Sequence, residues 1–577
     1  MEKEISEQTS DKGGRRVLRF GVMCEEQGLT DWQARCIEDL LKVDGVEVAL
    51  LIMRDGQPSA PPPAPPRRPG GKRLLWRVYR RFILDRSSQA ARLVPWPTWQ
   101  QDVAVSRVRV EPVGRFGERF APESVADIRS HNLDFLLRFG FGILKGEVLE
   151  AARYGIWSFH HGDPASYRGM PPGFWEIHDG NPVTGAVLQR LTERLDAGVV
   201  LHAGHFQTRH ASYVRSRDDL LFGTGEWPAR ICKEILSGND AALHADPIRD
   251  EGPIKYEPGD RAMLTFLWRQ ARAWVANQVR FTFFQQQWTV GILPAPVHEV
   301  ALAPPGAEAR QVQWLPEPRG RFLADPFAVE MADRSGLLIL AEDFDWNQNI
   351  GRVSAVRIAG GKASEPRLAP SLPYHLSYPY LVRHADRLYC IPESSQSGRV
   401  ELHLLDEEGL DWNLEAILIE GRHLLDSTVF QHDGRWWLLA TDADDGANLK
   451  LRGWFADDLH GPWQEHALNP LKTDVRSARP AGRPFVHEGA LYRPAQDCSR
   501  VYGGGVAINR VTALSPTSFE EETVRTILPD PRWPYRDGFH TICGEGESTI
   551  IDACRNAFSL RGAVNEILRK ARSFVRR

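Results

Sequence analysis

Residues 155–201 read GIWSFHHGDPASYRGMPPGFWEIHDGNPVTGAVLQRLTERLDAGVVL, and this run decides how the first half of the chain folds. It opens with an apolar, aromatic strand over 156–159, which ends at His160 and His161. Turn-forming residues follow, then a second strand and a loop that carries Asp196. A histidine at a strand end and a carboxylate on a later loop suit an acid–base site at the edge of an α/β sheet.

The residues around this run alternate between strand and helix patterns. Strands are predicted over 17–24, 46–53, 107–110, 134–139 and 186–191, and helices over 31–42, near 122–130, over 145–154 and over 218–237. Strand–helix–strand at the first of these spacings predicts parallel pairing with a right-handed crossover. No glycine-rich phosphate loop follows the first strands, which argues against a nucleotide cofactor in this sheet. The sequence therefore predicts an α/β, Rossmann-like domain over 17–240.

Composition excludes several classes of protein. The 577 residues are 42% hydrophobic and 25% charged with a net charge of −4, so no preference for nucleic acid is expected. Seven cysteines form no CxxC pair, which favours a reducing compartment and predicts no disulfide framework and no metal site. Residues 1–16 are polar and expected to be disordered, with no secretory signal, and no apolar run is long enough to span a membrane. A cytoplasmic location is expected.

Four short motifs follow one another along this domain. They are Ser158-Phe159-His160, Arg168-Gly169, Thr184-Gly185-Ala186 and Leu195-Asp196-Ala197-Gly198, with His160 and Asp196 36 residues apart. In type and spacing the motifs resemble the catalytic core of the folate-dependent formyltransferases, a family that includes methionyl-tRNA formyltransferase. The chain departs from that family in two places: Ser158 stands at the position of an asparagine, and residues 162–165 replace an S-L-L-P segment.

The resemblance implies transfer of a formyl group from 10-formyltetrahydrofolate to an amine through a tetrahedral intermediate. It implies that His160 and Asp196 handle the amine proton and that Ser158 donates to the oxyanion. The loss of one oxyanion donor typically costs about 10²–10³ in rate if nothing replaces it. Other expected substrate or cofactor contacts are Phe139, Gly140, Gly142, His161, Asp163, Arg168 and Gly169. The alternatives are structural: strand filling for Ser158, a tight turn for the glycines and turn stabilisation for Arg168.

The second half of the chain is a repeat. Four segments share a turn, an alternating strand and an acidic end, and a fifth is a weaker copy: Gly336-LLILAED, Asp386-RLYCIPE, Gly434-RWWLLATD, Gly489-ALYRPAQD and Glu547-STIID. Their starts lie 48 to 58 residues apart. About fifty residues per unit is the period of a four-stranded propeller blade. The sequence therefore predicts an all-β, five-bladed propeller over 301–556.

The first strand of each blade lines the central funnel of a propeller. That geometry is expected to gather Asp325, Tyr378, Asp426, Arg479 and His540 at one polar mouth, with Glu393, Asp442 and Asp497 at nearby strand ends. Convergent carboxylates, an arginine and aromatic rings suit a sugar or phospho-sugar. The alternative for such residues is a hydrogen bond to the neighbouring blade, above all for Asp325, which precedes a proline.

The repeat resembles the five-bladed propellers of glycosidases and the N-terminal region of plant glucosamine inositolphosphorylceramide transferases. Such glycosidases carry their essential acids in the order Asp, Asp, Glu along the chain. Here the order is Asp325, Glu393, Asp426, so the resemblance favours sugar binding over glycoside cleavage. A scaffold or interface role is the remaining alternative.

Two basic segments flank these domains. Residues 72–86, within a proline-rich and basic insertion over 57–100, carry six basic residues, one acid and an apolar stripe. Residues 561–577, in a tail predicted from 557 onward, have the same composition. Both are candidates for peripheral contact with an anionic membrane, and the alternative is a helix docked on its own domain. Residues 241–300 are expected to form a linker and a connecting helix.

Together these patterns predict an enzyme that transfers a formyl group to an amino group of a sugar or glycolipid precursor, with the propeller holding the carbohydrate. The first alternative is a carbohydrate-binding or assembly protein whose formyltransferase-like domain has lost catalysis. A donor other than folate, carrying another acyl or a carbamoyl group, is a further alternative. So is a propeller associated with a glycosidase or glycosyltransferase of polysaccharide biosynthesis.

Overall fold

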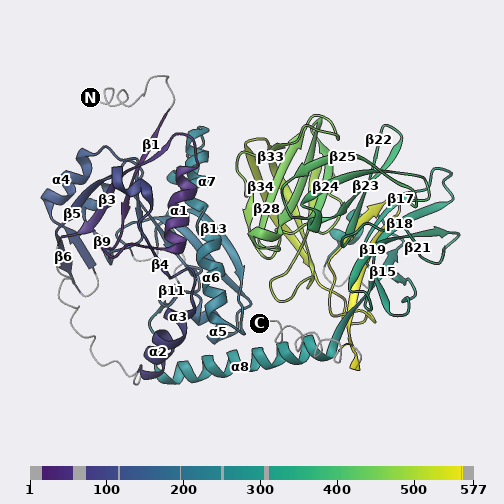
Figure 1. The fold of residues 1–577 in the computed structure, drawn as a ribbon, viewed down its shortest axis with the longest axis horizontal. Helices are drawn as coiled ribbons and strands as arrows, with labels where there is room; N and C mark the ends of the chain where they lie inside the picture. Colours follow the sequence, from purple (N-terminus) through teal and green to yellow (C-terminus); the bar gives the residue numbers. More distant parts are fainter. Residues whose placement is uncertain are drawn as a thin grey trace. The chain divides into compact units, whose positions relative to one another are not determined.

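The computed structural model describes residues 16–55, 73–114, 117–194, 197–248, 252–304, 311–560 and 562. The chain divides into two compact units, residues 1–274 and 275–577 (Figure 1). The first contains an α/β region and the second is all-β apart from short helical segments. The prediction of an α/β region followed by an all-β region is therefore confirmed. Asp196 and residues 563–577 lie outside the described residues.

A seven-stranded sheet organises the first unit. Its order is β13 (Val199–Gln207), β12 (Val183–Arg190), β10 (Ile156–His160), β8 (Phe135–Arg138), β1 (Leu18–Met23), β3 (Val46–Arg54) and β5 (Ala104–Val108). The five strands from β10 to β5 pair in parallel, whereas β12 and β13 pair antiparallel at one edge. Buried, β-branched and aromatic residues favour these strands, and the rings of Phe20, Phe135 and Trp157 stack across three of them.

The first unit also contains two strand pairs and one three-stranded sheet among its described residues. They are β2 (Leu29–Thr30) with β4 (Leu93–Val94), β6 (Val110–Val113) and β9 (Ile143–Lys145) on either side of β7 (Gly117–Phe120), and β11 (Arg168–Gly169) with β14 (Ile254–Lys255). The predicted strand over 107–110 is thus the end of β5 and the start of β6.

Helices α1 (Asp31–Leu41) and α4 (Pro122–Ser130) lie where they were predicted. The helix expected over 218–237 is two helices, α6 (Tyr213–Thr224) and α7 (Trp227–Leu236), because Gly225 ends the first and Pro228 opens the second. The helix expected over 145–154 is reduced to a single 3₁₀ turn, Glu147–Glu150.

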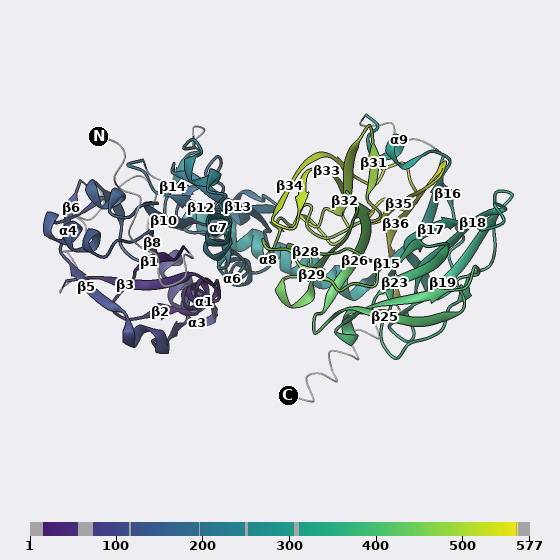
Figure 2. The same ribbon diagram turned by 90° about the horizontal axis from the view of Figure 1, so that it is seen from above.

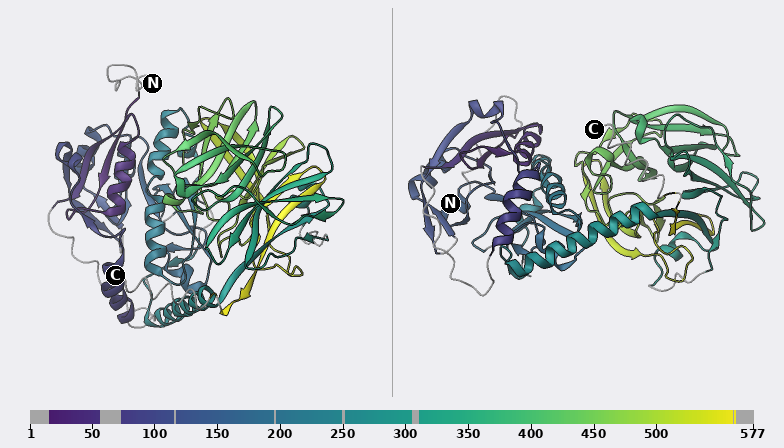
Figure 3. Two further views of the ribbon diagram at one scale, coloured as in Figure 1. Left: turned by 45° about the vertical axis from the view of Figure 1, so that its right-hand side comes forward. Right: turned by 60° about the horizontal axis from the view of Figure 1, so that its bottom comes forward.

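The basic segment after the proline-rich stretch is helical. It consists of α2 (Leu74–Tyr79), a π-helical turn, η1 (Arg80–Leu84), and α3 (Asp85–Ser87). One of its faces packs Trp76, Tyr79 and Leu84 against α5 (Phe174–Asp179) and the first half of α8 (Asp260–Phe283). Figure 3 shows α8 as one continuous helix. Among the described residues, no helix is long and apolar enough to cross a membrane.

The described part of the second unit begins with the end of α8 and contains the short helix α9 (Val297–Ala301), short 3₁₀ turns and five antiparallel sheets. The first sheet is β16 (Gln313–Trp314), β15 (Phe284–Leu293), β36 (Ser548–Phe558) and β35 (Ile542–Glu545); the second is β17 (Arg321–Glu330), β18 (Gly336–Asp345), β19 (Ile350–Ala359), β20 (Lys362–Ala363) and β21 (Arg367–Leu368). The third is β22 (Ser377–His384), β23 (Arg387–Glu393), β24 (Arg399–Leu405) and β25 (Trp412–Glu420). The fourth is β26 (Leu424–His432), β27 (Arg435–Asp442), β28 (Lys450–Ala456), β29 (Gln464–Glu465) and β30 (Lys472–Thr473), and the fifth is β31 (Phe485–His487), β32 (Ala490–Gln496), β33 (Val506–Ser515) and β34 (Ser518–Ile527).

The five segments of the predicted repeat form strands β18, β23, β27, β32 and β36, one in each sheet. The first sheet joins strands from opposite ends of the unit, since β15 pairs along its whole length with β36 (Figure 2). Residues 284–293 are therefore part of a sheet. The expected linker over 241–300 extends too far, and so does the tail predicted from 557, because Ala557 and Phe558 still belong to β36.

Candidate functional site

The second unit contains a cavity of about 270 Å³, lined by side chains from three sheets and from the loops between strands. Its polar lining consists of Asp325, Glu342, Glu393, His375, Arg479 and His540, with Gln286 and Ser377. Its aromatic lining consists of Trp288, Phe322, Phe344, Trp346 and Tyr502. Of the predicted funnel residues, the structure brings Asp325, Glu393, Arg479 and His540 together at this cavity.

Three sheets carry the same local irregularity in their first strand. The pairing register shifts at Asp325, Tyr378 and Asp426, where φ is +49°, +43° and +52°. A bulge with a left-handed residue turns a side chain out of the regular alternation of a strand, at a cost in backbone energy. The next strand of the sheet places Glu342 opposite Ala324 and Glu393 opposite Ser377, beside two of these bulges.

The buried carboxylate of Asp552 holds the backbone at Asp325 and His540, two residues that line the cavity. This carboxylate accepts hydrogen bonds from the backbone N–H groups of Asp325, His540 and Thr541, at 2.9, 3.0 and 2.9 Å, and from His540 Nδ1 at 2.6 Å. Asp325, His540 and Asp552 together could hold a cation, since their ligand atoms lie within 4.8 Å of one another. Because four donors already occupy the Asp552 carboxylate, the group serves as an ion-pair cluster that fixes the imidazole of His540.

The cluster changes the acidity of its members. Burial alone would lower the pKa of His540, but the carboxylates of Asp552 and Asp325 outweigh it and raise that pKa above its ordinary value. Burial raises the pKa of Asp325 to about 6, and nearby Asp426 and Asp552 add to the rise, while His540 and a hydrogen bond from Thr541 Oγ1 at 2.8 Å oppose it. The His540 ring also stacks on Trp288 at 3.9 Å, which fixes its plane.

Glu342 faces the cavity from the second sheet. Burial, and repulsion from Asp325 and Glu393, raise its pKa well above the ordinary value of a glutamate. Its Oε1 lies 3.4 Å from His375 Nε2. His375 Nδ1 accepts a hydrogen bond from the Gly351 N–H at 2.9 Å, so the ring proton sits on Nε2 and points toward Glu342. Burial lowers the pKa of His375, which therefore stays neutral and gives Glu342 no counter-charge.

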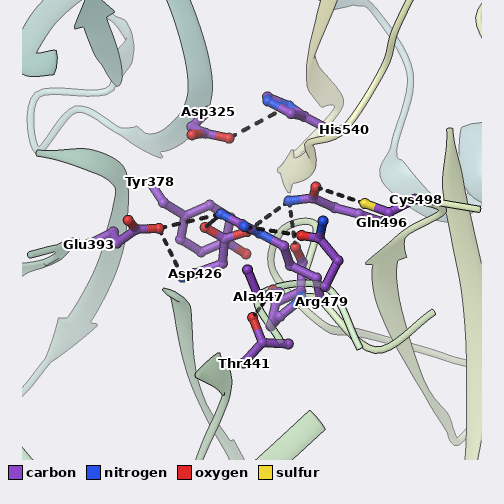
Figure 4. Close-up of polar contacts among 12 residues, drawn as sticks. Asp325, Tyr378, Glu393, Asp426, Thr441, Ala447, Arg479, Gln496, Cys498 and His540 are labelled. Carbon is purple, nitrogen blue, oxygen red and sulfur yellow. Dashed lines mark hydrogen bonds and ion pairs between the residues drawn. The ribbon is translucent and has the colours of Figure 1, made fainter. Parts of the chain in front are cut away.

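Arg479 and Asp426 form a buried bidentate pair (Figure 4). Arg479 Nε and Nη2 donate to the two carboxylate oxygens at 2.5 and 3.0 Å, and Gln496 Nε2 donates to the same carboxylate at 2.7 Å. Arg479 Nη2 lies 3.5 Å from Glu393. Burial and the nearby carboxylate of Asp426 raise the pKa of Glu393 well above its ordinary value. Asp426 is not part of the cavity lining, so its predicted place at the mouth is wrong. Its carboxylate forms an ion pair with Arg479 instead.

Three other predicted funnel residues also lie away from the lining. The Tyr378 hydroxyl accepts the Gly482 N–H at 2.8 Å and bonds Thr428 Oγ1 at 2.8 Å, which ties neighbouring sheets together. Asp442 accepts the Asp444 N–H, and Asp497 accepts the Ser499 N–H, each within its own turn. Tyr378 therefore has the contact with a neighbouring sheet that the alternative interpretation expected, whereas Asp442 and Asp497 stabilise their own turns. The contributors missed from sequence are Glu342, His375, Asp552 and most of the aromatic lining.

His160 ends strand β10 in the first unit and is almost fully buried. Its Nε2 lies 2.9 Å from the carbonyl oxygen of Tyr167, and a carbonyl only accepts, so the Nε2 proton is donated there. In the neutral ring Nδ1 then carries no proton. Asp196, its predicted partner, lies outside the described residues.

Ser158 lies on the same face of β10 as His160, two residues away. Its hydroxyl accepts a hydrogen bond from Arg138 Nε at 3.1 Å, and Arg138 Nη1 donates to the Gly142 carbonyl at 2.6 Å. A guanidinium thus stands next to the position where the formyltransferase resemblance expects an amide donor. Arg138 was missed from sequence because it ends a different strand, β8.

The glycine turn after β8 is filled by the chain itself. A Cβ at Gly140 would meet Glu25 and Cys24 at 3.1 and 3.2 Å, and a Cβ at Gly142 would meet Glu118 at 3.0 Å. Phe139 packs edge-on against Trp32 at 5.2 Å. These contacts favour the tight-turn interpretation of 139–142 over a ligand cradle.

His161, Asp163 and the Arg168–Gly169 pair also have structural partners. His161 packs on Phe159 and Trp32, its Nε2 contacts Thr224 Oγ1 at 3.1 Å, and burial lowers its pKa to about 3. Asp163 accepts from Ala165 N and Ser166 Oγ and so caps its own turn. Arg168 and Gly169 form β11, where a Cβ at Gly169 would lie 2.2 Å from the Lys255 carbonyl oxygen.

Glu176 on α5 is a buried carboxyl that sequence reasoning did not single out. Burial raises its pKa to about 8, and its Oε1 has no hydrogen-bond partner among the described residues. Its position on an ordinary amphipathic helix carries no sequence signal. At neutral pH this side chain is protonated.

The two halves of the chain are similar to different known proteins. The profile of the family described as "Glucosamine inositolphosphorylceramide transferase 1, N-terminal" matches residues 319–534. The glucosamine inositolphosphorylceramide transferase 1 of Oryza sativa subsp. japonica is 34% identical over 218 residues, which cover 37% of this chain and 29% of the relative. The Arabidopsis thaliana protein of the same name is 33% identical over 218 residues, 37% of this chain and 28% of the relative. The chain thus spans under a third of the length of these relatives.

The first half is more weakly similar to methionyl-tRNA formyltransferase. The Prochlorococcus marinus enzyme is 31% identical over 117 residues, which cover 20% of this chain and 34% of the relative.

Among solved structures, an exo-β-1,3-galactanase from Clostridium thermocellum matches 38% of this chain and 54% of its own, with a TM-score of 0.31 and 16% identity. A glycinamide ribonucleotide transformylase from Symbiobacterium toebii matches 38% of this chain with a TM-score of 0.26 and 14% identity. TM-scores this low support no argument about either half.

Proposed function

We propose that this protein is a transferase that acylates an amino group of a carbohydrate. The second unit binds the sugar in its cavity, and the first unit carries out the transfer. The observation that carries the proposal is the combination of buried carboxyls and aromatic rings around one cavity of about 270 Å³. Aromatic faces pack against the apolar faces of sugar rings, and convergent polar groups fix their hydroxyls.

The charge of the cavity favours an amino sugar. Both cations of its lining are already paired, Arg479 with Asp426 and His540 with Asp552. The carboxyls of Asp325, Glu342 and Glu393 all have raised pKa values, because burial and repulsion from nearby carboxylates disfavour their ionised forms. An ammonium group on the ligand would relieve that repulsion. Acylation removes the ligand charge, so the product would bind more weakly than the substrate.

Two features support a propeller for the second unit. The first sheet is closed by strands from both ends of the unit, β15 and β36, as in propellers whose ring is sealed by one composite blade. Side chains near the bulges also bond across sheets: Tyr378 with Thr428, and Thr541 with Asp325. In the proposed arrangement the five sheets are blades and the cavity lies at their shared axis.

In the proposed transfer, the amine nitrogen attacks the acyl carbon, and the acyl oxygen becomes an oxyanion. When the C=O bond re-forms, the bond between the acyl carbon and the donor breaks, and the proton taken from the amine passes to the leaving donor atom. The imidazole of His160, whose Nε2 is held by the Tyr167 carbonyl, is the proposed acceptor of the amine proton. Arg138, next to Ser158, supplies the cationic donor for the oxyanion in place of an amide. Asp196 is the proposed partner of His160, as the resemblance implies.

A folate formyl donor is proposed on the resemblance alone. The turn that the resemblance assigns to the donor is filled by Glu25, Cys24 and Glu118, so the described residues there do not fit a cofactor. The proposed chemistry therefore includes only steps made by this chain's own side chains. A cytoplasmic location likewise stays a proposal.

The second candidate is a carbohydrate-binding protein without catalysis. The pairing of Ser158 with Arg138 favours it, because a guanidinium already hydrogen-bonded to the chain has fewer donors left for a substrate. Glycoside cleavage is disfavoured, since the bidentate contact with Arg479 neutralises Asp426.

A formylation assay separates these candidates. The purified protein is incubated with 10-formyltetrahydrofolate and a nucleotide-linked amino sugar, and the product is measured by mass spectrometry. We expect formamide product from wild type, a loss of at least about 10² in rate for His160→Gln, and near-normal rates for the matched control His161→Gln. No product from wild type would contradict the transferase proposal, and full activity in His160→Gln would contradict the mechanism.

A further inference from the structure

Helix α8 carries an exposed apolar stripe along its length. Leu264, Trp268, Val275 and Val279 are 61%, 59%, 51% and 44% exposed. Residues spaced four, seven and four positions apart lie on one face of an α-helix. The opposite face of the same helix is buried through Met263 and Phe266. The stripe is therefore a second apolar face, additional to the one through which the first half of the helix packs within the first unit.

The neighbouring helical segment repeats this arrangement. In α2 and η1, Leu74, Val78, Phe82 and Ile83 are 53%, 46%, 52% and 44% exposed. These are not the residues that dock the segment, because that contact uses Trp76, Tyr79 and Leu84. The segment lies beside the first half of α8 (Figure 1): Tyr79 packs edge-on against Phe266 at 5.6 Å, and Asp260 accepts the Leu75 N–H at 2.9 Å.

Arginines accompany both apolar faces. Helix α8 carries Arg261, Arg269, Arg272 and Arg280 against the single acid Asp260, which the Leu75 backbone already uses. The segment from Arg73 to Ser87 carries five arginines against Asp85. Glu257 offsets Arg73 and Arg80, at 3.4 and 3.6 Å. The whole chain has a net charge of −4, so this positive excess is local.

We propose that α8 and the α2–η1 segment form a surface that binds an anionic membrane, with both helices lying in the plane of the interface. A helix with aromatic and aliphatic side chains on one face and arginines beside them is the composition of an interfacial helix. The Trp268 indole, stacked with Arg272 at 5.7 Å, suits the boundary between headgroups and acyl chains. Arginine side chains are stabilised next to anionic headgroups. This charge complementarity favours an anionic lipid surface over a second copy of this chain, whose net charge is only −4.

Vesicle flotation tests the proposal on the full-length protein. One set of vesicles is pure phosphatidylcholine, and the other contains phosphatidylglycerol in addition. We expect the protein to float with the anionic vesicles, to bind the neutral ones weakly, and to dissociate as salt is raised. The double variants Leu264→Ser/Trp268→Ser and Val78→Ser/Phe82→Ser should each lower the partition coefficient at least about tenfold.

The matched control is Val486→Ser/Leu528→Ser, whose side chains are 64% and 62% exposed on the second unit. It should bind vesicles like wild type. Arg77→Glu/Arg272→Glu should abolish the preference for anionic vesicles, whereas the exposed Arg500→Glu should leave it intact. Unchanged thermal unfolding verifies that each variant folds. Absence of vesicle binding by wild type would overturn the proposal, as would a Leu264→Ser/Trp268→Ser variant that changes only the oligomeric mass.

Discussion

At the scale of single residues, the Arg479–Asp426 pair gives the sharpest expectation. Removing one member of a buried, bidentate ion pair leaves the other charge without compensation, which typically costs about 3–5 kcal/mol. We expect Arg479→Met to lower the free energy of unfolding by that amount. The double variant Arg479→Met/Asp426→Asn should recover much of the loss, as measured by chemical denaturation. Equal stability of Arg479→Met and wild type would show that Asp426 is not held as an ion.

Glu176 predicts a pH-dependent stability. Its folded pKa, raised to about 8, exceeds the ordinary value of 4.5. The folded state therefore holds one more proton than the unfolded state between these pH values, and the stability present below pH 4.5 is lost as pH rises toward 8. Glu176→Gln removes this contribution. Denaturation at pH 5, 7 and 9 should show a stability loss in wild type, of up to about 4 kcal/mol, that the variant lacks.

Some single residues were predictable from their place at the start of each repeat, whether that place is a strand, as at Asp325, or a loop, as at Arg479 and His540. Asp325, Arg479 and His540 were expected at one mouth and do line one cavity. Glu342 was missed although it stands in the acidic end of the first repeat, and it pairs beside a bulge, opposite Ala324, as Glu393 does opposite Ser377. Asp426 and Tyr378 were predicted to lie at the mouth of the funnel. The sequence indicates which strand contains a residue, but it does not indicate which neighbouring residue hydrogen-bonds its side chain.

At the scale of elements, Gly169 predicts a strict requirement for glycine in β11. Its φ is +91°, and a Cβ would lie 2.2 Å from the Lys255 carbonyl oxygen. Gly238 has a similar φ of +89° with nothing within 4 Å of a Cβ. Gly238→Ala should therefore cost only the conformational strain, about 1 kcal/mol, and Gly169→Ala clearly more, because the β11–β14 pairing must shift. Thermal unfolding of both variants measures the difference, and equal losses would contradict the close approach.

Elements were predictable where periodicity was strong and caps were present. The helices over 31–42 and 122–130 follow this rule. The helix over 218–237 was predicted as one because its apolar pattern continues across Gly225 and Pro228, which divide it. The bulges at Asp325, Tyr378 and Asp426 could not be foreseen from alternation, since a bulge inserts one residue without changing the hydrophobic character of the strand.

At the scale of the whole molecule, the order of an α/β region and an all-β region follows from sequence alone. The boundary does not: the all-β region starts at 284, because β15 pairs with a strand from the far end of the chain. Such a pairing depends on contacts between residues more than 250 positions apart, about which local patterns carry no information.

The charge of the cavity predicts how ligand affinity changes with pH. Asp325 ionises as pH rises through about 6, and each added negative charge strengthens the attraction for an ammonium ligand. The affinity for an amino hexose should rise several-fold between pH 5 and pH 7, and the affinity for the corresponding neutral hexose should not. Asp325→Asn should flatten the rise. Fluorescence titration of the cavity tryptophans measures both ligands, and a pH-independent affinity in wild type would contradict this assignment.

The most direct test of the account is calorimetric titration of the full-length protein with an amino hexose glycoside and with its N-formyl derivative. The two ligands differ in the charge of one nitrogen. We predict that the amine binds at least about tenfold tighter, and that Glu342→Gln narrows the difference. Equal affinity for the two ligands, or tighter binding of the formamide, would contradict the claim that this cavity selects the amino substrate of the transfer.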